Sequence, residues 1–442
     1  MLIVFIFSLS LCDAESLALK NAPELVTMEE NLEAMNAEYR ALLFSFSPSL
    51  YVKGNAPSVN YYSDDIYYPG SPYPIPYWQR YESRGGEVGF SSSLPFGGEG
   101  SISYSLYKNE EYYNLYENRE YYEGRLNFSL SQPILGVSQS WDGIKEKKRE
   151  IQDYRLSIMQ KKREIIKNVI RNYVNLWVLK TERNLIRKIS SSAQFSQEKL
   201  DFLYKNNLMD KVEYLRVKQK YGLLIVEGMN LDSRLNEAIF TLKSLTGLDS
   251  IDVSEPEIPE IAGSPVPDDY FALCHLESEK KSLLRQKSEL LRNLLPSLDI
   301  SLSLGLRGKG DMEEAKILKK NTYNINLSLN LPIFSPPNYL HISGINHRID
   351  GINKRIEATQ KKVAFKKLEM VKKTEIERKK IKILKGSLNA SEQILKSKNL
   401  DYLPFHERLD VINDYINAIK SFAETLKEFL ELSTEFVNAE GK

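Results

Sequence analysis

Few residues of this sequence are spaced for chemistry. Its two cysteines, Cys12 and Cys274, are too few and too far apart for a disulfide framework or a cysteine-based zinc site. The four histidines show none of the close spacings that metal sites favour. No serine, histidine and carboxylate stand in a recognisable nucleophile motif, and no Gly-Lys-Ser/Thr follows the glycine pairs. We therefore expect no enzyme, no catalytic residue, no bound metal and no cofactor.

Glu407 and Asp410 are the acidic pair with the most suggestive spacing. They stand three residues apart in Glu-Arg-Leu-Asp, which places both carboxylates on one face of a helix. Taken alone, they are most simply explained as solvated surface charges.

The overall charge excludes one class of partner. The chain of 442 residues has 60 Lys and Arg against 59 Asp and Glu, and its lysine-rich stretches alternate with acidic residues. A polyanion binder carries a basic excess, so we expect no binding to nucleic acid.

The N-terminal residues 1–14 resemble a secretory leader. About ten apolar residues are too few to span a bilayer, which needs about 20, and cleavage is expected after Ala14. Lipidation at Cys12 is an alternative, although Leu11 is larger than the residue usual before a lipidated cysteine. No segment has 18 consecutive apolar residues. If the protein spans a membrane, it must therefore do so as a closed barrel.

The same order of patterns occurs twice along the chain. Residues 126–135 and 325–334 are identical at five of ten positions, and each follows a Pro-Ser-Leu triplet, at Pro48 and Pro296. We predict a first repeat over 15–249, a proline-rich linker over 250–267 and a second repeat over 268–442.

Strict alternation of apolar and polar residues predicts strands. It covers 101–106, 126–131, 298–306 and 323–331, within strand regions expected at about 47–135 and 297–333. A soluble sandwich and a membrane barrel would both show this alternation. The tyrosine-rich segment 61–122 favours the barrel, because aromatic residues gather at membrane interfaces. The proline-rich residues 68–78 are expected to form an exposed loop.

Long helices are expected at about 136–249 and 340–437. The first stretch lacks proline and is expected to break near Ser190. The expected class is therefore mixed and mainly α. So few strands cannot close a barrel alone, so strands must be pooled among subunits.

One motif resembles a known family. Tyr204, Asn207, Asp210 and Glu213 stand at the spacing of the turn that joins paired long helices in the TolC family of outer-membrane efflux proteins. The Pro-Ser-Leu and Pro-Ile motifs and Leu19–Leu25 are also similar, and together the resemblance covers residues 16–437. Asn207 replaces the family's turn glycine, which asparagine's access to left-handed backbone geometry permits.

The resemblance implies a homotrimer in the outer membrane. Three chains of four strands each would form a twelve-stranded barrel, continued by a helical tunnel through the periplasm. A periplasmic adaptor and an inner-membrane transporter would dock on it, in a tripartite efflux pump or a type I secretion system. Residues 86–107 exceed the family pattern and are expected to add a hairpin or to lengthen the first strand pair.

The resemblance also implies a gate at the far end of the tunnel. Glu407 and Asp410 would form an acidic ring there, and Glu213 with Lys398 would lock it. The second repeat departs from the family at Lys398, Asp401 and Pro404, which alters the turn there. The expected function is a passive exit duct for drugs or proteins. The alternative is a periplasmic or surface coiled-coil interaction protein with a small β head.

Overall fold

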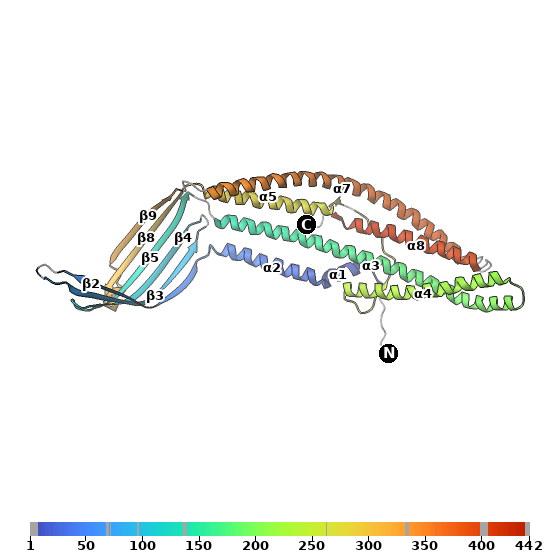
Figure 1. Cartoon of the computed structure of the whole chain (residues 1–442), viewed down its shortest axis with the longest axis horizontal. Helices are drawn as coiled ribbons and strands as arrows, with labels where there is room; N and C mark the ends of the chain where they lie inside the picture. The colour runs from blue at the N-terminus through green and yellow to red at the C-terminus, as the bar shows by residue number, and fades with distance from the viewer. Residues whose placement is uncertain are drawn as a thin grey trace, which may run out of the picture. The chain divides into compact units, whose positions relative to one another are not determined.

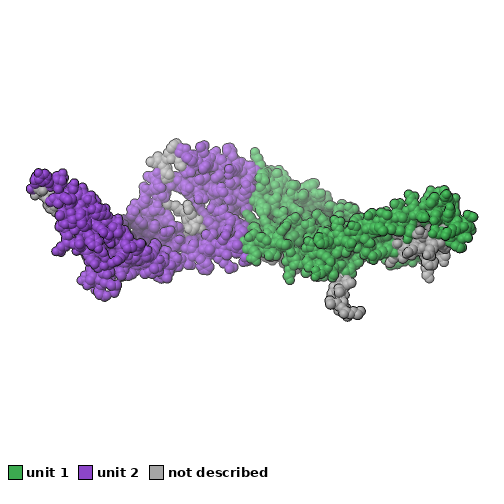
Figure 2. Space-filling model, turned by 60° about the horizontal axis from the view of Figure 1, so that its bottom comes forward, with its two compact units in different colours: residues 1–32, 153–277, 354–442 green, residues 33–152, 278–353 purple. Residues whose placement is uncertain are grey.

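The computed structural model describes residues 8–67, 70, 72–94, 97–135, 139–261, 263–331, 336–397 and 405–437. The chain divides into two compact units, which Figure 2 colours separately. Unit 1, here the helical unit, comprises residues 1–32, 153–277 and 354–442. Unit 2, here the sheet unit, comprises residues 33–152 and 278–353 and holds the long strands.

The sheet unit is built on one antiparallel sheet of six strands (Figure 1). Each strand pairs with the next along the sheet and in the opposite direction. In spatial order the strands are β2 (Ser49–Ile66), β3 (Ile75–Ser93), β4 (Glu99–Tyr113), β5 (Arg119–Leu135), β8 (Ser297–Gly310) and β9 (Lys320–Asn330).

The four strands per chain implied by the resemblance are too few, because the sheet formed by the described residues has six. The added pair, β3 and β4, forms a hairpin between β2 and β5 that includes most of residues 86–107, which is one of the two outcomes expected for that segment. Residues 101–106 of β4 alternate as predicted, but β3 is rich in glycine, serine and tyrosine, so its two faces contrast too little in hydropathy to stand out in the sequence. The expected loop over 68–78 is shorter than predicted, since Pro76 and Trp78 lie in β3.

Two glycines allow a short helix to pack closely against the sheet. Helix α6 (Met312–Lys316) joins β8 to β9, and its residue Ala315 is completely buried. A Cβ at Gly124 or Gly308 would stand within 2.4 Å of the Ala315 carbonyl oxygen. Only glycine permits this approach.

A bulge alters β2 near its middle. The pairing with β3 shifts between Asn55 and Ser58, so one extra residue of β2 is accommodated there. Successive side chains of a strand point to opposite faces. Because of the extra residue, even-numbered residues of β2 before the bulge and odd-numbered residues after it therefore lie on the same face of the sheet.

The long helices are α2 (Pro23–Phe44), α3 (Gln139–Lys205), α4 (Lys211–Thr246), α5 (Asp268–Arg292), α7 (Pro336–Lys396) and α8 (Phe405–Ser433). Helix α3 continues through Ser190, so the break predicted there is wrong. That region contains neither glycine nor proline, and the chain turns at 206–210 instead.

Aromatic residues fill the core of the helical unit. Tyr173, Phe422 and Phe429 are fully buried, and the Trp177 and Phe422 rings meet edge to face with centroids 6.2 Å apart. The Tyr173 hydroxyl donates to the Leu9 carbonyl oxygen at 2.7 Å. A buried phenol needs such a partner, so this bond fixes the N-terminal segment on α3.

Short strands occur where none was expected. Within the predicted linker 250–267, β6 (Asp252–Val253) pairs with β1 (Ser8–Leu9), and β7 (Ser264–Pro265) pairs with β10 (Phe436–Val437). The prolines did not prevent this, because a two-residue edge strand needs few ladder hydrogen bonds.

The predicted leader includes residues that the structure packs. Leu9, Leu11 and Ala14 are buried, and helix α1 (Leu11–Asn21) begins inside residues 1–14. Cleavage after Ala14 and lipidation at Cys12 stay predictions.

Candidate functional site

One face of the six-stranded sheet is apolar and uncovered. A single register row crosses all six strands through Leu50, Phe90, Ile102, Phe128, Leu304 and Tyr323. The side chains of this row are between 42% and 80% exposed. On β8 the apolar positions continue from Leu298 to Leu306, nine residues, which is the length that a tilted strand needs to cross lipid.

The opposite face of the sheet is polar. The neighbouring row consists of Ser49, Ser91, Ser101, Ser129, Ser303 and Asn324. Serine hydroxyls meet across the strands, with 2.7 Å between the Oγ atoms of Ser101 and Ser129. Further along this face, Ser103, Ser105, Asn109 and Glu123 are only 2–7% exposed.

The sheet therefore inverts the arrangement of a water-soluble protein. A soluble sandwich buries the apolar face of each sheet and leaves the polar face in water. Here the polar face is the more buried one, while the apolar row is open to the surroundings. Contiguous exposed apolar surface on this scale marks contact with lipid or with another protein.

The buried polar groups pair with one another. Glu123 forms ion pairs with Arg125 and Arg307, and the Arg307 Nη2 donates to its Oε2 at 2.9 Å. The Lys309 ammonium lies 3.5 Å from the centre of the Tyr121 ring. A buried carboxylate is tolerated only with such partners, so the two arginines stabilise the charge of Glu123 on this face.

The apolar face ends along the strands at a charged zone. The Lys108 ammonium lies 2.7 Å from Glu110 and 2.6 Å from Glu120, and Arg84 also reaches Glu110, at 3.1 Å. By register these residues stand on the same face as Phe90 and Ile102. Strands β2 to β5 thus extend past the apolar rows into a segment suited to water.

Helix α4 has apolar residues on two opposite faces. One set is buried, at Val217, Leu231, Leu235, Ala238 and Leu242. The other set is exposed, at Val212, Leu215, Leu223, Val226, Met229 and Phe240. At 100° per residue the two sets stand on opposite sides of the helix. Other described residues of the chain cover only the first of these two faces of α4.

Helix α7 shows the same division in its part within the helical unit. Val363, Met370 and Ile381 are buried. Phe365, Ile376, Ile383 and Ile394 are exposed, at intervals of 11, 7 and 11 residues. These intervals are close to whole numbers of helical turns, so the exposed residues form one stripe.

The predicted turn residues lie between α3 and α4. Asn207 has a φ of 50°, the left-handed geometry that the family's turn glycine adopts more easily. Asp210 is the N-cap of α4 and accepts a hydrogen bond from the Val212 amide at 3.0 Å. The rings of Tyr204 and Tyr214 stack with centroids 4.5 Å apart. The three predicted residues therefore form one compact helical hairpin end.

The predicted gate residues are only partly within the described structure. Glu213 stands exposed in the first turn of α4. Glu407 and Asp410 stand exposed in the first two turns of α8. Lys398 lies outside the described residues, as do Asp401 and Pro404, so the lock between Glu213 and Lys398 stays a prediction.

Solved structures with this fold include outer-membrane channels. The outer-membrane protein VceC from Vibrio cholerae shares 11% identity, with a TM-score of 0.59 over 96% of this chain and 94% of its own. The CmeC outer-membrane channel of Campylobacter jejuni shares 14%, with a TM-score of 0.58 over 97% and 87%. The open-state MtrE outer-membrane channel of Neisseria gonorrhoeae shares 13%, with a TM-score of 0.62 over 98% and 90%.

The chain has the fold of outer-membrane channel proteins. This confirms, for the fold, the resemblance to the TolC family. No protein-family model and no curated protein sequence matches the chain.

None of the helices formed by the described residues is both long and apolar enough to be a membrane span. No group of three or more histidine, cysteine and acidic side chains among the described residues is placed to hold a metal ion.

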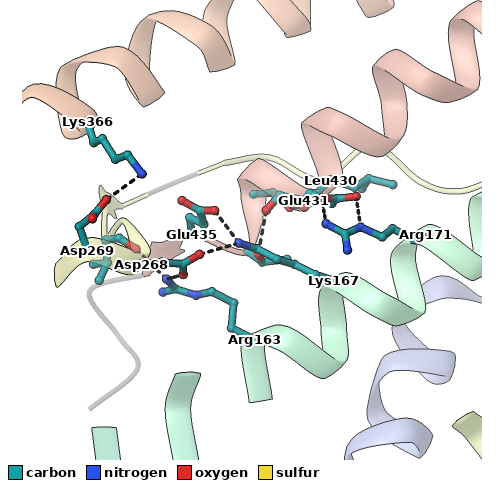
Figure 3. A network of polar contacts seen from close by, with 12 residues as sticks. Arg163, Lys167, Arg171, Asp268, Asp269, Lys366, Leu430, Glu431 and Glu435 are labelled. Atoms are coloured by element: carbon teal, nitrogen blue, oxygen red, sulfur yellow. Dashed lines mark hydrogen bonds and ion pairs between the residues drawn. The ribbon is translucent and has the colours of Figure 1, made fainter. Parts of the chain in front are cut away.

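A cluster of ion pairs joins four elements of the helical unit (Figure 3). We call it the charge clamp: Arg163, Lys167 and Arg171 of α3, Asp268 and Asp269 of α5, Lys362 and Lys366 of α7, Glu431 of α8, and Glu435 just after α8. Sequence reasoning missed it, since the paired residues stand about 90 to 270 positions apart.

The clamp holds α5 at its first turn. Arg163, nearly buried, donates to the Val266 carbonyl oxygen at 2.7 Å and to Asp268 at 3.2 Å. Asp269 lies 2.7 Å from both Lys362 and Lys366, whose hydrogen bonds lower the pKa of its carboxyl group below the ordinary value of 3.8. The two acidic residues also suit the positive end of the helix dipole.

The cap of α4 gives a first prediction. Replacing Asp210→Ala removes the acceptor of the Val212 amide, a loss of about 0.5–2 kcal/mol at an N-cap. We expect amide exchange in the first turn of α4 to rise about 2- to 30-fold, measured by hydrogen–deuterium exchange. Asp210→Ser keeps a capping oxygen and should exchange like the wild type. Equal exchange in the alanine and serine variants would show that the cap contributes nothing.

The clamp gives a prediction about pH. A carboxyl group with a lowered folded pKa stabilises the protein fully above its unfolded pKa, and this contribution is lost as the pH falls through the folded value. Asp269→Asn should therefore lower stability by about 1 kcal/mol at pH 7, since its lysine partners are half exposed. The difference from wild type should shrink below pH 3.8.

Thermal unfolding followed by helical circular dichroism at pH 7, 5, 4 and 3 measures this difference. Asp249→Asn, at an exposed position, is the control for loss of one carboxylate. A difference that does not change with pH would exclude the ion pairs as its source.

Proposed function

We infer that this chain is one protomer of a trimeric exit duct in the outer membrane, a passive conduit rather than an enzyme. The inverted sheet is the observation that supports this most strongly. An apolar face needs lipid, and a buried polar face needs water on its inner side. A closed barrel in a membrane provides both. The channel fold of the solved structures adds independent support.

The two edges of the sheet support assembly with other copies. Every residue of β9 is exposed, and so is every residue of β2 except Tyr51 and Ile66. In lipid, an open edge would leave backbone groups without hydrogen bonds. With six alternating strands, the β9 of one copy runs antiparallel to the β2 of the next. Copies of the chain can therefore close the sheet.

The helical unit supports the same assembly. The exposed stripes of α4 and α7 lie on helices whose opposite faces already pack within the chain. A helix that is apolar on two sides is suited to neighbours on both. Neighbouring copies would cover these stripes and complete a helical tunnel. The resemblance to the TolC family supplies the number of copies, three.

The hairpin end and α8 support a role in gating. In this proposal Glu407 and Asp410 ring the periplasmic opening, and Glu213 with Lys398 holds it shut. A periplasmic adaptor and an inner-membrane transporter would dock there and drive the helices apart. The duct would then pass drugs in an efflux pump or proteins in a type I secretion system, without consuming energy itself.

The alternative, a coiled-coil interaction protein with a soluble β head, is less well supported. In that protein the apolar row of the sheet would lie in water. Its side chains are at least 42% exposed, so water would contact a large apolar surface. At about 25 cal/mol per Å², uncovered surface of this kind is strongly unfavourable.

The helix stripes give a prediction about assembly. Native mass spectrometry of the detergent-extracted protein should find a trimer of about 150 kDa, three times the 50.9 kDa of one chain. Ile383→Asp places a charge in each of three buried contacts, which costs several kcal/mol per site. The trimer should dissociate into folded single chains.

Asn389→Asp is the control, because it adds the same charge to α7 away from the stripe. It should leave the trimer intact. A wild-type protein that is a water-soluble monomer or dimer, absent from outer-membrane fractions, would overturn the proposed function.

The acidic pair gives a prediction about conduction. Rings of carboxylates favour cations in a pore, so Glu407→Ala with Asp410→Ala should lower the cation-to-anion permeability ratio toward about 1. Planar-bilayer recordings in a salt gradient measure this ratio. The pair Glu424→Ala and Glu428→Ala removes the same charge further along α8 and should change little. Unchanged selectivity in the first variant would exclude the ring.

A further inference from the structure

We propose that the β3–β4 hairpin is part of the membrane wall, so that three chains close a barrel of eighteen strands instead of twelve. This inference rests on the proposed function, because it assumes a trimeric membrane barrel. It concerns the one feature in which the sheet departs from the four strands per chain implied by the resemblance.

The rows of the sheet pass through the hairpin without interruption. Phe90 and Ile102 connect Leu50 of β2 with Phe128 of β5 in the apolar row. In the polar row Ser91 and Ser101 connect Ser49 with Ser129.

A second apolar row shared with the hairpin is equally consistent. Val88 of β3 and Tyr104 of β4 stand in register between Val52 and Leu126. The hairpin thus has the same lipid-facing and inward-facing sides as its neighbours.

The topology shows why a hairpin is the unit that could be added. β2 runs antiparallel to β3, and β4 runs antiparallel to β5. Without β3 and β4, β2 and β5 would still run in opposite directions and could pair directly. Two strands can therefore be inserted with no change in the direction of any other strand.

Other positions of the hairpin would be unfavourable. Folded into the lumen or above the membrane, it would place Phe90 and Ile102 in water, where their side chains would remain about half exposed. It would also break the pairing of β3 with β2 and of β4 with β5. Even with β2 and β5 paired directly, β3 and β4 would each keep one edge without a partner. Inside the wall, lipid would cover the apolar side chains and neighbouring strands would pair the backbone groups.

A wall of eighteen strands changes the size of the duct. Barrel diameter grows roughly linearly with strand number. With strands about 4.8 Å apart and tilted by about 40°, twelve strands give a backbone diameter of about 24 Å and eighteen give about 36 Å. The opening in the membrane would be about one and a half times as wide, in the range where barrels leave an aqueous channel.

Lipid-specific quenching tests the proposal one residue at a time. In a background with Cys12→Ala and Cys274→Ala, single cysteines replace Phe90 or Ser91 in β3 and Ile102 or Ser101 in β4. Phe128 and Ser129 in β5 provide the matched controls. Each variant is labelled with an environment-sensitive fluorophore and reconstituted as the intact protein in vesicles with or without brominated lipid.

If the hairpin is in the wall, brominated lipid should quench the label at positions 90 and 102 as strongly as at 128. Quenching should be lost at 91 and 101, as at 129. If only position 128 is quenched, the hairpin lies outside the wall and the proposal is wrong, while the proposed function stands. If position 128 is not quenched either, the sheet does not face lipid and the proposed function itself fails.

Electron cryo-microscopy of the same protein in nanodiscs gives a second measurement. A cross-section at the level of Phe90 should contain eighteen strands. Twelve strands, with β3 and β4 elsewhere, would overturn the proposal even if labelling had disturbed the variants.

Discussion

Every backbone N–H and C=O group in a lipid-facing sheet must find its hydrogen-bond partner in another strand, because lipid offers none. The six-stranded sheet meets this requirement everywhere except along β2 and β9. A single chain is therefore an unfinished structure in a membrane. The exposed stripes of α4 and α7 show that the helical unit is unfinished as well. In the assembly we infer, one set of neighbouring copies completes both.

The polarity of the sheet depends on register. Six strands align their apolar side chains in common rows, so one face is uniformly apolar and the other uniformly polar. Charged side chains on the polar face then need partners on that face, as Glu123 has in Arg125 and Arg307. In the assembly we infer, folding of such a sheet gains little from a core of its own, since lipid and other copies would cover its apolar side chains.

The sequence predicted the elements whose signals are local. Strands β8 and β9 alternate strictly, and the resemblance to the TolC family placed the turn between α3 and α4 at Asn207 and Asp210. Strand β3 gave little signal, because Gly85, Gly86 and Gly89 have no side chains to alternate. The tyrosines of that segment have an apolar ring and a polar hydroxyl group, so they do not indicate which face of a strand is apolar.

Other features depend on residues far apart in the chain. The charge clamp joins Lys167 to Glu435, 268 positions away, and no local pattern indicates such a pair. The short strands β6 and β7 form because β1 and β10 are brought beside them, in spite of nearby prolines. Helix α3 continues past Ser190, since a serine run without glycine or proline does not stop a long helix.

The bulge at Asn55 and Ser58 has a genetic consequence. A gain or loss of one codon within a strand exchanges the lipid side and the water side of everything up to the next turn. Changes of two codons preserve both sides. In the membrane wall that we propose, single-codon changes should survive only where a bulge can absorb them, as in β2. The lengths of the strands are therefore expected to drift between relatives in even steps.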